Sequence, residues 1–244
     1  MKRALVWLLI AAGAGISGCT ASEDGKWYRQ PPEAWPPITM INEITYTDMH
    51  HPIAGCAFLL DLGSDTLAVT AKHILTFFKS ESMNSVSFRN RLESWKMYPK
   101  DHPDDGVLVD RLLNEDEGES IERVPSPGDW LLFTIKEKSP HIQVLQPRET
   151  PLQEGEPVFI VGWRYSDKDC PQVIYKGAFV RSEGETHIIS TERLSDNTMP
   201  GLSGSPVVDA RGRVIGLMSQ KAGKLERVSS LAYPMRVWRA QTAG

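Results

Sequence analysis

The sequence predicts an all-β protein, and three observations carry that prediction. Short apolar segments recur along the chain from residue 41 onward. Clusters of Gly, Pro, Asp and Ser separate these segments, as turns do in β-sandwiches and β-barrels. No long window shows the 3.6-residue apolar period of a helix. The length of 244 residues also suits one large β domain.

Composition and charge exclude several classes of protein. Hydrophobic residues make up 41% of the chain and charged residues 24%. These values exclude a disordered chain, a collagen and a protein with many membrane spans. The net charge of -4 predicts no basic surface and therefore no nucleic-acid partner. Three cysteines are too few for a scaffold held together by disulfides.

The N-terminus has the pattern of a secretion signal. Lys2 and Arg3 precede an apolar run over residues 4–16. A membrane-spanning helix needs roughly 20 apolar residues, so a run of this length predicts a signal peptide instead.

The segment after that run, Ile16-Ser-Gly-Cys19, resembles the lipobox of bacterial lipoproteins. The resemblance implies that residues 1–18 are a lipoprotein signal peptide and that Cys19 carries the lipid. It also implies a lipid-anchored protein of the bacterial cell envelope, and Thr20 favours the outer membrane, facing the periplasm. An ordinary signal peptide followed by a chance cysteine is the alternative.

Residues 19–40 then read as the lipidated cysteine and a Pro-rich tether, followed by a folded domain over residues 41–244. Trp27, Tyr28 and Trp35 are expected to dock on that domain rather than on lipid headgroups.

Two cysteines remain in the mature chain, Cys56 and Cys170. An oxidising envelope would permit a disulfide between them. Two separate, buried thiols are the equal alternative.

A hairpin is predicted from Cys56 to Thr70, with turn residues at Gly63-Ser-Asp. One short helix is expected over residues 74–79, and a second at the C-terminal end of the segment 228–240. Further strands are expected over residues 131–135, 142–145, 157–163, 173–180, 187–191, 206–208 and 213–218.

Residues 80–127 interrupt this rhythm with an acidic stretch between Lys100 and Arg123. A calcium site is one interpretation, but Asn114-Glu-Asp-Glu-Gly118 lacks the residue order of an EF-hand. We therefore expect a solvated acidic loop. Whether it covers the active site is left open.

The most suggestive serine lies in Met199-Pro-Gly-Leu-Ser203-Gly-Ser-Pro206. Glycines on both sides of Ser203 permit a sharp bend that exposes the side chain. Such a bend can also aim consecutive backbone N–H groups at one point, as an oxyanion hole requires. A simple turn before a strand is the alternative.

A serine nucleophile needs a histidine base, and the chain order limits the choice. All six histidines precede Ser203, which excludes the Ser-acid-His order of α/β-hydrolases. His73 directly follows the strand predicted at residues 66–70 and is the best candidate. The other five are expected at the surface or at a strand end, namely His50, His51, His102, His141 and His187.

Asp129 is the best candidate for the acid that orients the histidine. It begins the apolar strand Trp130-Leu-Leu-Phe133, where a carboxylate is partly shielded from water. Asp104 and Asp105 are weaker substitutes, and an ordinary solvated aspartate is the alternative.

Together, Thr70-Ala-Lys-His73, Gly128-Asp129-Trp and Gly201-Leu-Ser203-Gly-Ser-Pro206 resemble the trypsin-like serine proteases. The order His, Asp, Ser and the separations of 56 and 74 positions fit that family. The resemblance implies two antiparallel six-stranded β-barrels with the active site in the cleft between them.

It also implies a serine endopeptidase that works through an acyl-enzyme. His73 would act as the base, Asp129 would orient it, and Ser203 would attack the peptide carbonyl. Backbone N–H groups of Gly201 and Ser203 would bind the oxyanion. Ser219 would offer its backbone to an extended substrate.

The resemblance has departures and a rival. Leu202 replaces an Asp that pairs with a freed N-terminus in the digestive enzymes, so activation by such cleavage is not expected. Asn197 falls near the base of the specificity pocket, where the lack of an acid favours an apolar or small residue before the scissile bond. No PDZ domain follows residue 240. The resemblance implies protein or peptide substrates and no cofactor or metal. A catalytically silent barrel that serves as a membrane-tethered binding module is the rival.

Overall fold

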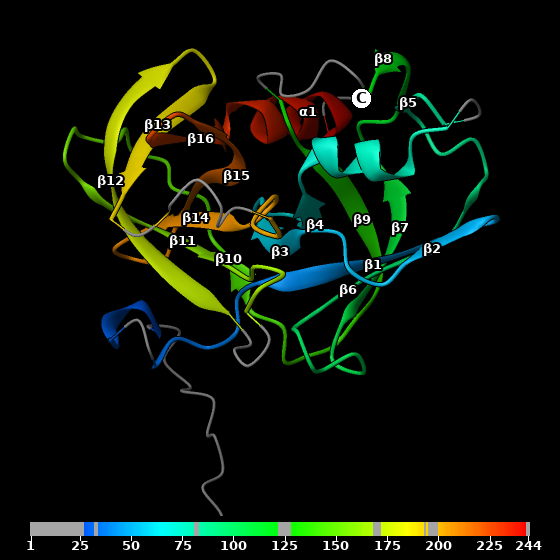
Figure 1. Ribbon diagram of the computed structural model, residues 1–244, viewed down its shortest axis with the longest axis horizontal. Coiled ribbons are helices and arrows are strands. Elements are labelled where there is room, and N and C mark those ends of the chain that lie inside the picture. The colour runs from blue at the N-terminus through cyan, green and yellow to red at the C-terminus, as the bar shows by residue number, and fades with distance from the viewer. Residues whose placement is uncertain are drawn as a thin grey trace, which may run out of the picture.

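The structure, a computed structural model, describes residues 27–31, 34–80, 83–121, 128–167, 172–192, 194 and 200–242. Two antiparallel β-barrels lie side by side, and the C-terminal helix α1 (Ala232–Thr242) runs across one end of the pair (Figure 1). The predicted all-β, two-barrel fold is confirmed.

The first barrel closes through pairing between the strand of residues 40–46 and the strand of residues 56–61. Met40 pairs with Ala57 and Ile41 with Cys56, which joins the two ends of a six-stranded ring. Two short strands extend it, β2 (Met49–His51) and β10 (Val144–Leu145). The ring itself consists of β1 (Met40–Tyr46), β3 (Cys56–Asp61), β4 (Thr66–Thr70), β9 (Leu131–Lys138), β7 (Val107–Leu112) and β6 (Leu92–Tyr98).

The second barrel is a closed ring of six antiparallel strands. Its members, in ring order, are β11 (Pro157–Gly162), β12 (Val173–Glu183), β13 (Thr186–Thr191), β16 (Leu225–Ser230), β15 (Val214–Ala222) and β14 (Pro206–Asp209). Closure removes the open sheet edges that invite aggregation.

Burial on both faces of one strand marks the contact between the barrels. Residues 56–60 of β3 are all buried, rather than alternating with exposed residues. One face of β3 lines the first barrel, while strand β14 of the second barrel lies against it. This contact brings the start of the first hairpin next to the loop that precedes β14.

The helices are few and short. The 3-10 helix η3 (Lys72–Phe78) follows β4 directly, and η1 (Trp27–Arg29) opens the described chain. Among the described residues, no helix is long and apolar enough to cross a membrane.

The expected solvated loop over residues 100–123 was wrong in part. Val107, Val109 and Leu112 are buried, and their strand β7 completes the first barrel. The apolar run of β7 is short and lies among acidic residues, so the sequence pattern did not indicate a strand there. The helix expected at the end of the segment 228–240 is α1, which begins at Ala232, while residues 228–230 complete β16.

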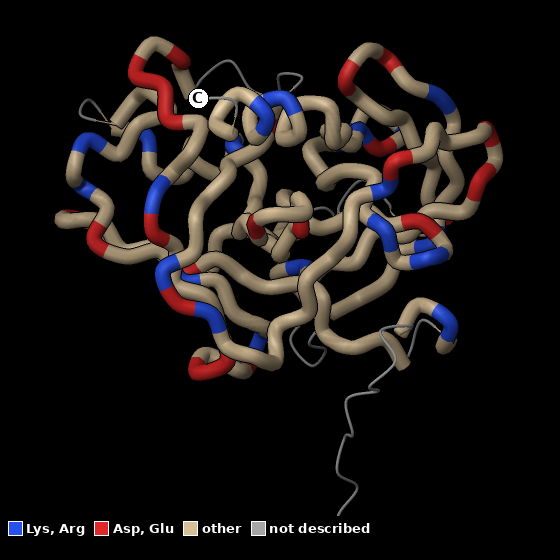
Figure 2. Tube along the Cα trace, turned by 180° about the vertical axis from the view of Figure 1, so that it is seen from behind, with Lys and Arg blue, Asp and Glu red and all other residues tan. Residues whose placement is uncertain are grey.

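Three of the acidic residues, Asp116, Glu117 and Glu119, lie on strand β8 (Asp116–Ser120), which pairs with β5 (Ser85–Val86) in a small two-stranded ribbon. We call it the β5–β8 ribbon. It projects beside the C-terminal end of α1 (Figure 1), and Figure 2 shows its acidic positions on the upper rim of the molecule. Elsewhere in that view, basic and acidic positions are intermingled.

The described part of the predicted tether packs against the second barrel. Trp27 and Trp35 are buried, and Tyr28 is half-buried. The Trp35 ring contacts Phe159 of β11 edge-on, with 5.3 Å between ring centres. Cys19 and the signal peptide lie outside the described residues.

The carboxylate of Glu226, on β16, is buried in the second barrel. The residue is fully buried, and the Thr191 hydroxyl donates a hydrogen bond of 2.8 Å to one of its oxygens. No described residue bonds the other oxygen. Burial raises the pKa of the Glu226 carboxyl, because the charged form loses its hydration.

We predict that Glu226→Gln stabilises the fold at pH 8 but not at pH 4. The folded state binds the Glu226 proton more tightly than the unfolded state does, so the carboxyl lowers stability as pH rises past its unfolded pKa. Melting temperatures of both proteins at the two pH values measure this. For a domain of this size, 1 kcal/mol corresponds to about 2–4 °C. A difference that does not change with pH contradicts the prediction.

Candidate active site

Three side chains that are distant in sequence form one continuous hydrogen-bonded chain. His73 Nε2 lies 2.6 Å from Ser203 Oγ. His73 Nδ1 lies 2.7 Å from Asp129 Oδ2. Sequence analysis proposed these same three residues, and the structure brings them together at the junction of the barrels.

His73 is held by the short helix that follows β4. Its ring is 19% exposed, so one edge remains open to solvent and to a substrate. The His73 backbone N–H donates to Asp129 Oδ1 at 2.9 Å, while the Thr76 hydroxyl donates to the His73 carbonyl at 2.7 Å. The backbone and the imidazole ring of His73 are therefore each held by hydrogen bonds of their own.

Asp129 is fully buried just before β9, and both of its oxygens accept hydrogen bonds. Oδ1 accepts from the His73 backbone, while Oδ2 accepts from the His73 ring and from the Ser219 hydroxyl. An ionised carboxylate can remain buried only when it is bonded in this way. The side chain of Ser219 therefore supports the acid, a contact that sequence analysis did not anticipate.

Ser203 sits in a tight loop whose backbone needs glycine. Gly201 and Gly204 have φ angles of 107° and 84°, which side-chain-bearing residues rarely adopt. Ser205 N–H donates to Leu202 O at 3.0 Å and closes the bend. Leu202 itself is fully buried in the core of the second barrel.

The loop is tied to both barrels through its backbone. Cys56 N–H, from the first barrel, donates to Ser203 O at 2.7 Å. Gly204 N–H donates to Met218 O, in the second barrel, at 2.9 Å. By contrast, no described residue accepts a hydrogen bond from the N–H of Gly201 or Ser203.

Cys56 is a free, buried cysteine beside this loop. Its thiol lies 3.2 Å from Gly201 O and 3.3 Å from Trp163 N. Burial raises the pKa of the Cys56 thiol to about 11, so it stays protonated at neutral pH. Because Cys56 is free, the structure agrees with a separate buried thiol at this position rather than a disulfide, while Cys170 lies outside the described residues.

Other predicted site residues have mixed outcomes. Asn197 lies outside the described residues, so the expected preference before the scissile bond stays a prediction. Asp104 and Asp105 lie in a turn before β7 and do not contact His73 in the described hydrogen bonds. No group of three or more His, Cys, Asp or Glu residues in the described ranges could hold a metal ion.

Comparison with known proteins agrees with this arrangement. The model of the trypsin-like peptidase domain family matches residues 55–217. The chain belongs to that family. It is accordingly a serine endopeptidase by class, a hydrolase that acts on proteins or peptides. A search of curated proteins returned no match.

Solved structures with the same fold are distant in sequence. The active form of the Rv3671c protease from M. tuberculosis has 15% identity and a TM-score of 0.53, over 83% of this chain and 80% of that one. The serine endoprotease from Yersinia pestis has 13% identity and a TM-score of 0.55, over 84% of this chain and 62% of that one. At these identities, the similarity establishes the fold.

We predict that Gly204→Ala destabilises the protein by about 2–5 kcal/mol, which combines left-handed backbone strain with overpacking. An added Cβ would overlap the carbonyl oxygen of Cys56, whose N–H holds the loop. Thermal unfolding measures the loss.

Gly223→Ala is the matched control, since Gly223 also has a positive φ, of 67°, but no atom within 4 Å of the added Cβ. It should lose only about 1–2 kcal/mol for the backbone strain. Equal losses at the two positions would mean that the contact with Cys56 does not constrain the loop.

Proposed function

We propose that the chain hydrolyses peptide bonds through Ser203, His73 and Asp129, by way of an acyl-enzyme, while anchored to the bacterial cell envelope. The observation that carries the catalytic part is the unbroken hydrogen-bonded chain from Ser203 Oγ through the His73 ring to Asp129.

In the proposed reaction, Ser203 Oγ attacks the carbonyl carbon of the scissile bond and passes its proton to His73 Nε2. The tetrahedral intermediate collapses, the C–N bond breaks, and His73 returns that proton to the leaving amine. Water then attacks the acyl-enzyme with His73 as the base, which releases the acid product and restores Ser203. The distance of 2.6 Å between Nε2 and Oγ suits both proton transfers.

Asp129 would keep the proton of the resting imidazole on Nδ1, so that Nε2 is free to accept. Its negative charge would also stabilise the imidazolium that forms during attack. The hydrogen bonds from Ser219 and from the His73 backbone hold the carboxylate in the required orientation.

The N–H groups of Gly201 and Ser203 would bind the oxyanion. They belong to the loop that carries the nucleophile, and no described residue accepts a hydrogen bond from them. Preorganised donors of this kind typically contribute about 10²–10³-fold to the rate.

The backbone of Ser219 would bind the substrate as an added strand. The pairing register of β15 and β16 shifts between Met218 and Gln220, and Ser219 has no partner residue on β16. An extended peptide next to it would pair through its main chain, which accommodates many sequences.

We predict that a fluorescent fluorophosphonate labels the full-length chain and that Ser203→Ala abolishes labelling. Ser205→Ala is the matched control, because Ser205 lies in the same loop but is buried, and this variant should still be labelled.

We also predict that Asp129→Asn lowers peptidase activity on a labelled casein by about 10⁴-fold, because the imidazole would adopt the wrong tautomer. A folded parent chain that is neither labelled nor active would favour the silent binding module.

Anchoring would come from a lipid on Cys19, as the segment Ile16-Ser-Gly-Cys19 indicates. We predict that the chain incorporates radiolabelled palmitate in a bacterial host and sediments with the membrane fraction. Cys19→Ser should remove the label and release the chain. Cys56→Ser is the control, because that buried cysteine should not affect labelling. Labelling that survives Cys19→Ser would contradict the proposed anchor.

A further inference from the structure

Lys72, the residue before His73, is buried in a way that the proposed reaction does not explain. Its side chain is only 3% exposed. Lysine is seldom buried so completely unless its charge is paired, because removing an ammonium from water is costly.

The Lys72 ammonium connects two segments that belong to neither barrel. Nζ lies 2.7 Å from Glu119 Oε1, on strand β8 of the β5–β8 ribbon. It also lies 5.1 Å from the centre of the Tyr233 ring, on helix α1, in a cation–π contact. One charged group therefore joins the ribbon, the C-terminal helix and the start of η3.

Lys72 and Tyr233 each contact the segment that carries Asp129. Lys72 N–H donates to the Asp129 carbonyl oxygen at 3.3 Å. The Tyr233 ring packs against Gly128, the residue before Asp129, so closely that a Cβ there would clash. Asn114 Nδ2 donates to the Tyr233 hydroxyl at 3.2 Å and fixes the ring. A displacement of Lys72 would thus move the backbone of both His73 and Asp129.

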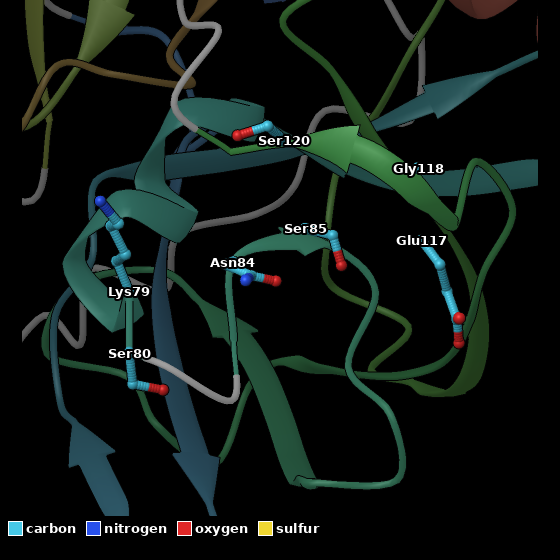
Figure 3. A pocket seen from close by; sticks show the side chains of 7 residues that line it. All are labelled: Lys79, Ser80, Asn84, Ser85, Glu117, Gly118 and Ser120. Atoms are coloured by element: carbon cyan, nitrogen blue, oxygen red, sulfur yellow. The ribbon is translucent and has the colours of Figure 1, made fainter.

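Beyond the end of η3, the chain continues into the ribbon, with a bridge between Ser80 and Met83 just before β5. Figure 3 shows a hollow between Lys79 and Ser80, at the end of η3, and Glu117 and Gly118, on β8. Its volume is about 600 Å³. The Lys72–Glu119 ion pair joins the ribbon to the start of η3, at the opposite end of that helix from Lys79 and Ser80, which line this hollow.

We propose that Lys72 and Glu119 are positioning residues, whose ion pair makes the alignment of His73 and Asp129 depend on the docked β5–β8 ribbon. This inference rests on the proposed function. The pair acts through the backbone and does not touch the substrate. Loss of either charge lowers the rate of the chemical step and leaves substrate binding unchanged.

The test measures how fast a fluorophosphonate inactivates the full-length chain, as the maximal rate kinact and the half-saturating concentration KI. Glu119→Gln and Lys72→Met should each lower kinact by about 10- to 100-fold, the typical effect of a small misplacement of catalytic groups. KI should stay within about twofold, since the groups that bind the probe are untouched. The double variant should lose no more than either single variant, because both remove one interaction.

Two further variants separate positioning from loss of structure. Glu117→Gln removes the same charge from an exposed site on the same ribbon and should leave kinact unchanged. Lys72→Arg keeps the charge and should retain most of the rate. All rates are measured below the melting temperature of each variant.

The outcomes separate the two proposals. A parent chain that does not react refutes the proposed function. A reactive parent with an equally reactive Glu119→Gln variant overturns the positioning role alone. So does a fall in melting temperature without a fall in kinact, or a double variant whose loss is the product of the two single losses.

Discussion

The buried carboxylate of Asp129 is the constraint on which the site depends. A charge sealed from water must have each oxygen bonded, or folding would become very costly. Its donors come from the backbone and ring of His73 in the first barrel and from the hydroxyl of Ser219 in the second. The carboxylate is therefore satisfied only when both barrels are docked in one relative position, and that position also sets the histidine against Ser203.

Other buried polar contacts between the barrels impose the same position. Cys56 N–H bonds to the carbonyl oxygen of Ser203, and Trp130 Nε1 donates to Ser230 O at 3.1 Å. Apolar packing tolerates small slips, whereas a hydrogen bond weakens steeply when its geometry changes. The apolar cores hold the barrels together, and these directional contacts define where one barrel lies on the other.

Much of this arrangement was predictable from local sequence. His73 follows a strand, Asp129 begins one, and glycines surround Ser203, so each of the three has a signature within a few residues of itself. The two barrels followed from a family resemblance that rests on those same segments. The burial of Lys72 was not predictable, because its partners Glu119 and Tyr233 are 47 and 161 positions away. Strand β7 was missed because its apolar run is short and lies among acids.

If Cys19 carries the proposed lipid, the docking of Trp27 against the second barrel limits how far the domain can lie from the membrane. Trp27 lies eight positions after Cys19, and eight steps of the chain span at most about 29 Å. An acyl chain on Cys19 would therefore keep the domain close to the bilayer, with the second barrel nearest to it. The enzyme would then reach only a thin layer of the envelope next to the membrane. Its substrates would be polypeptides that are attached to lipid or emerge from the membrane, rather than proteins dissolved in the rest of the compartment.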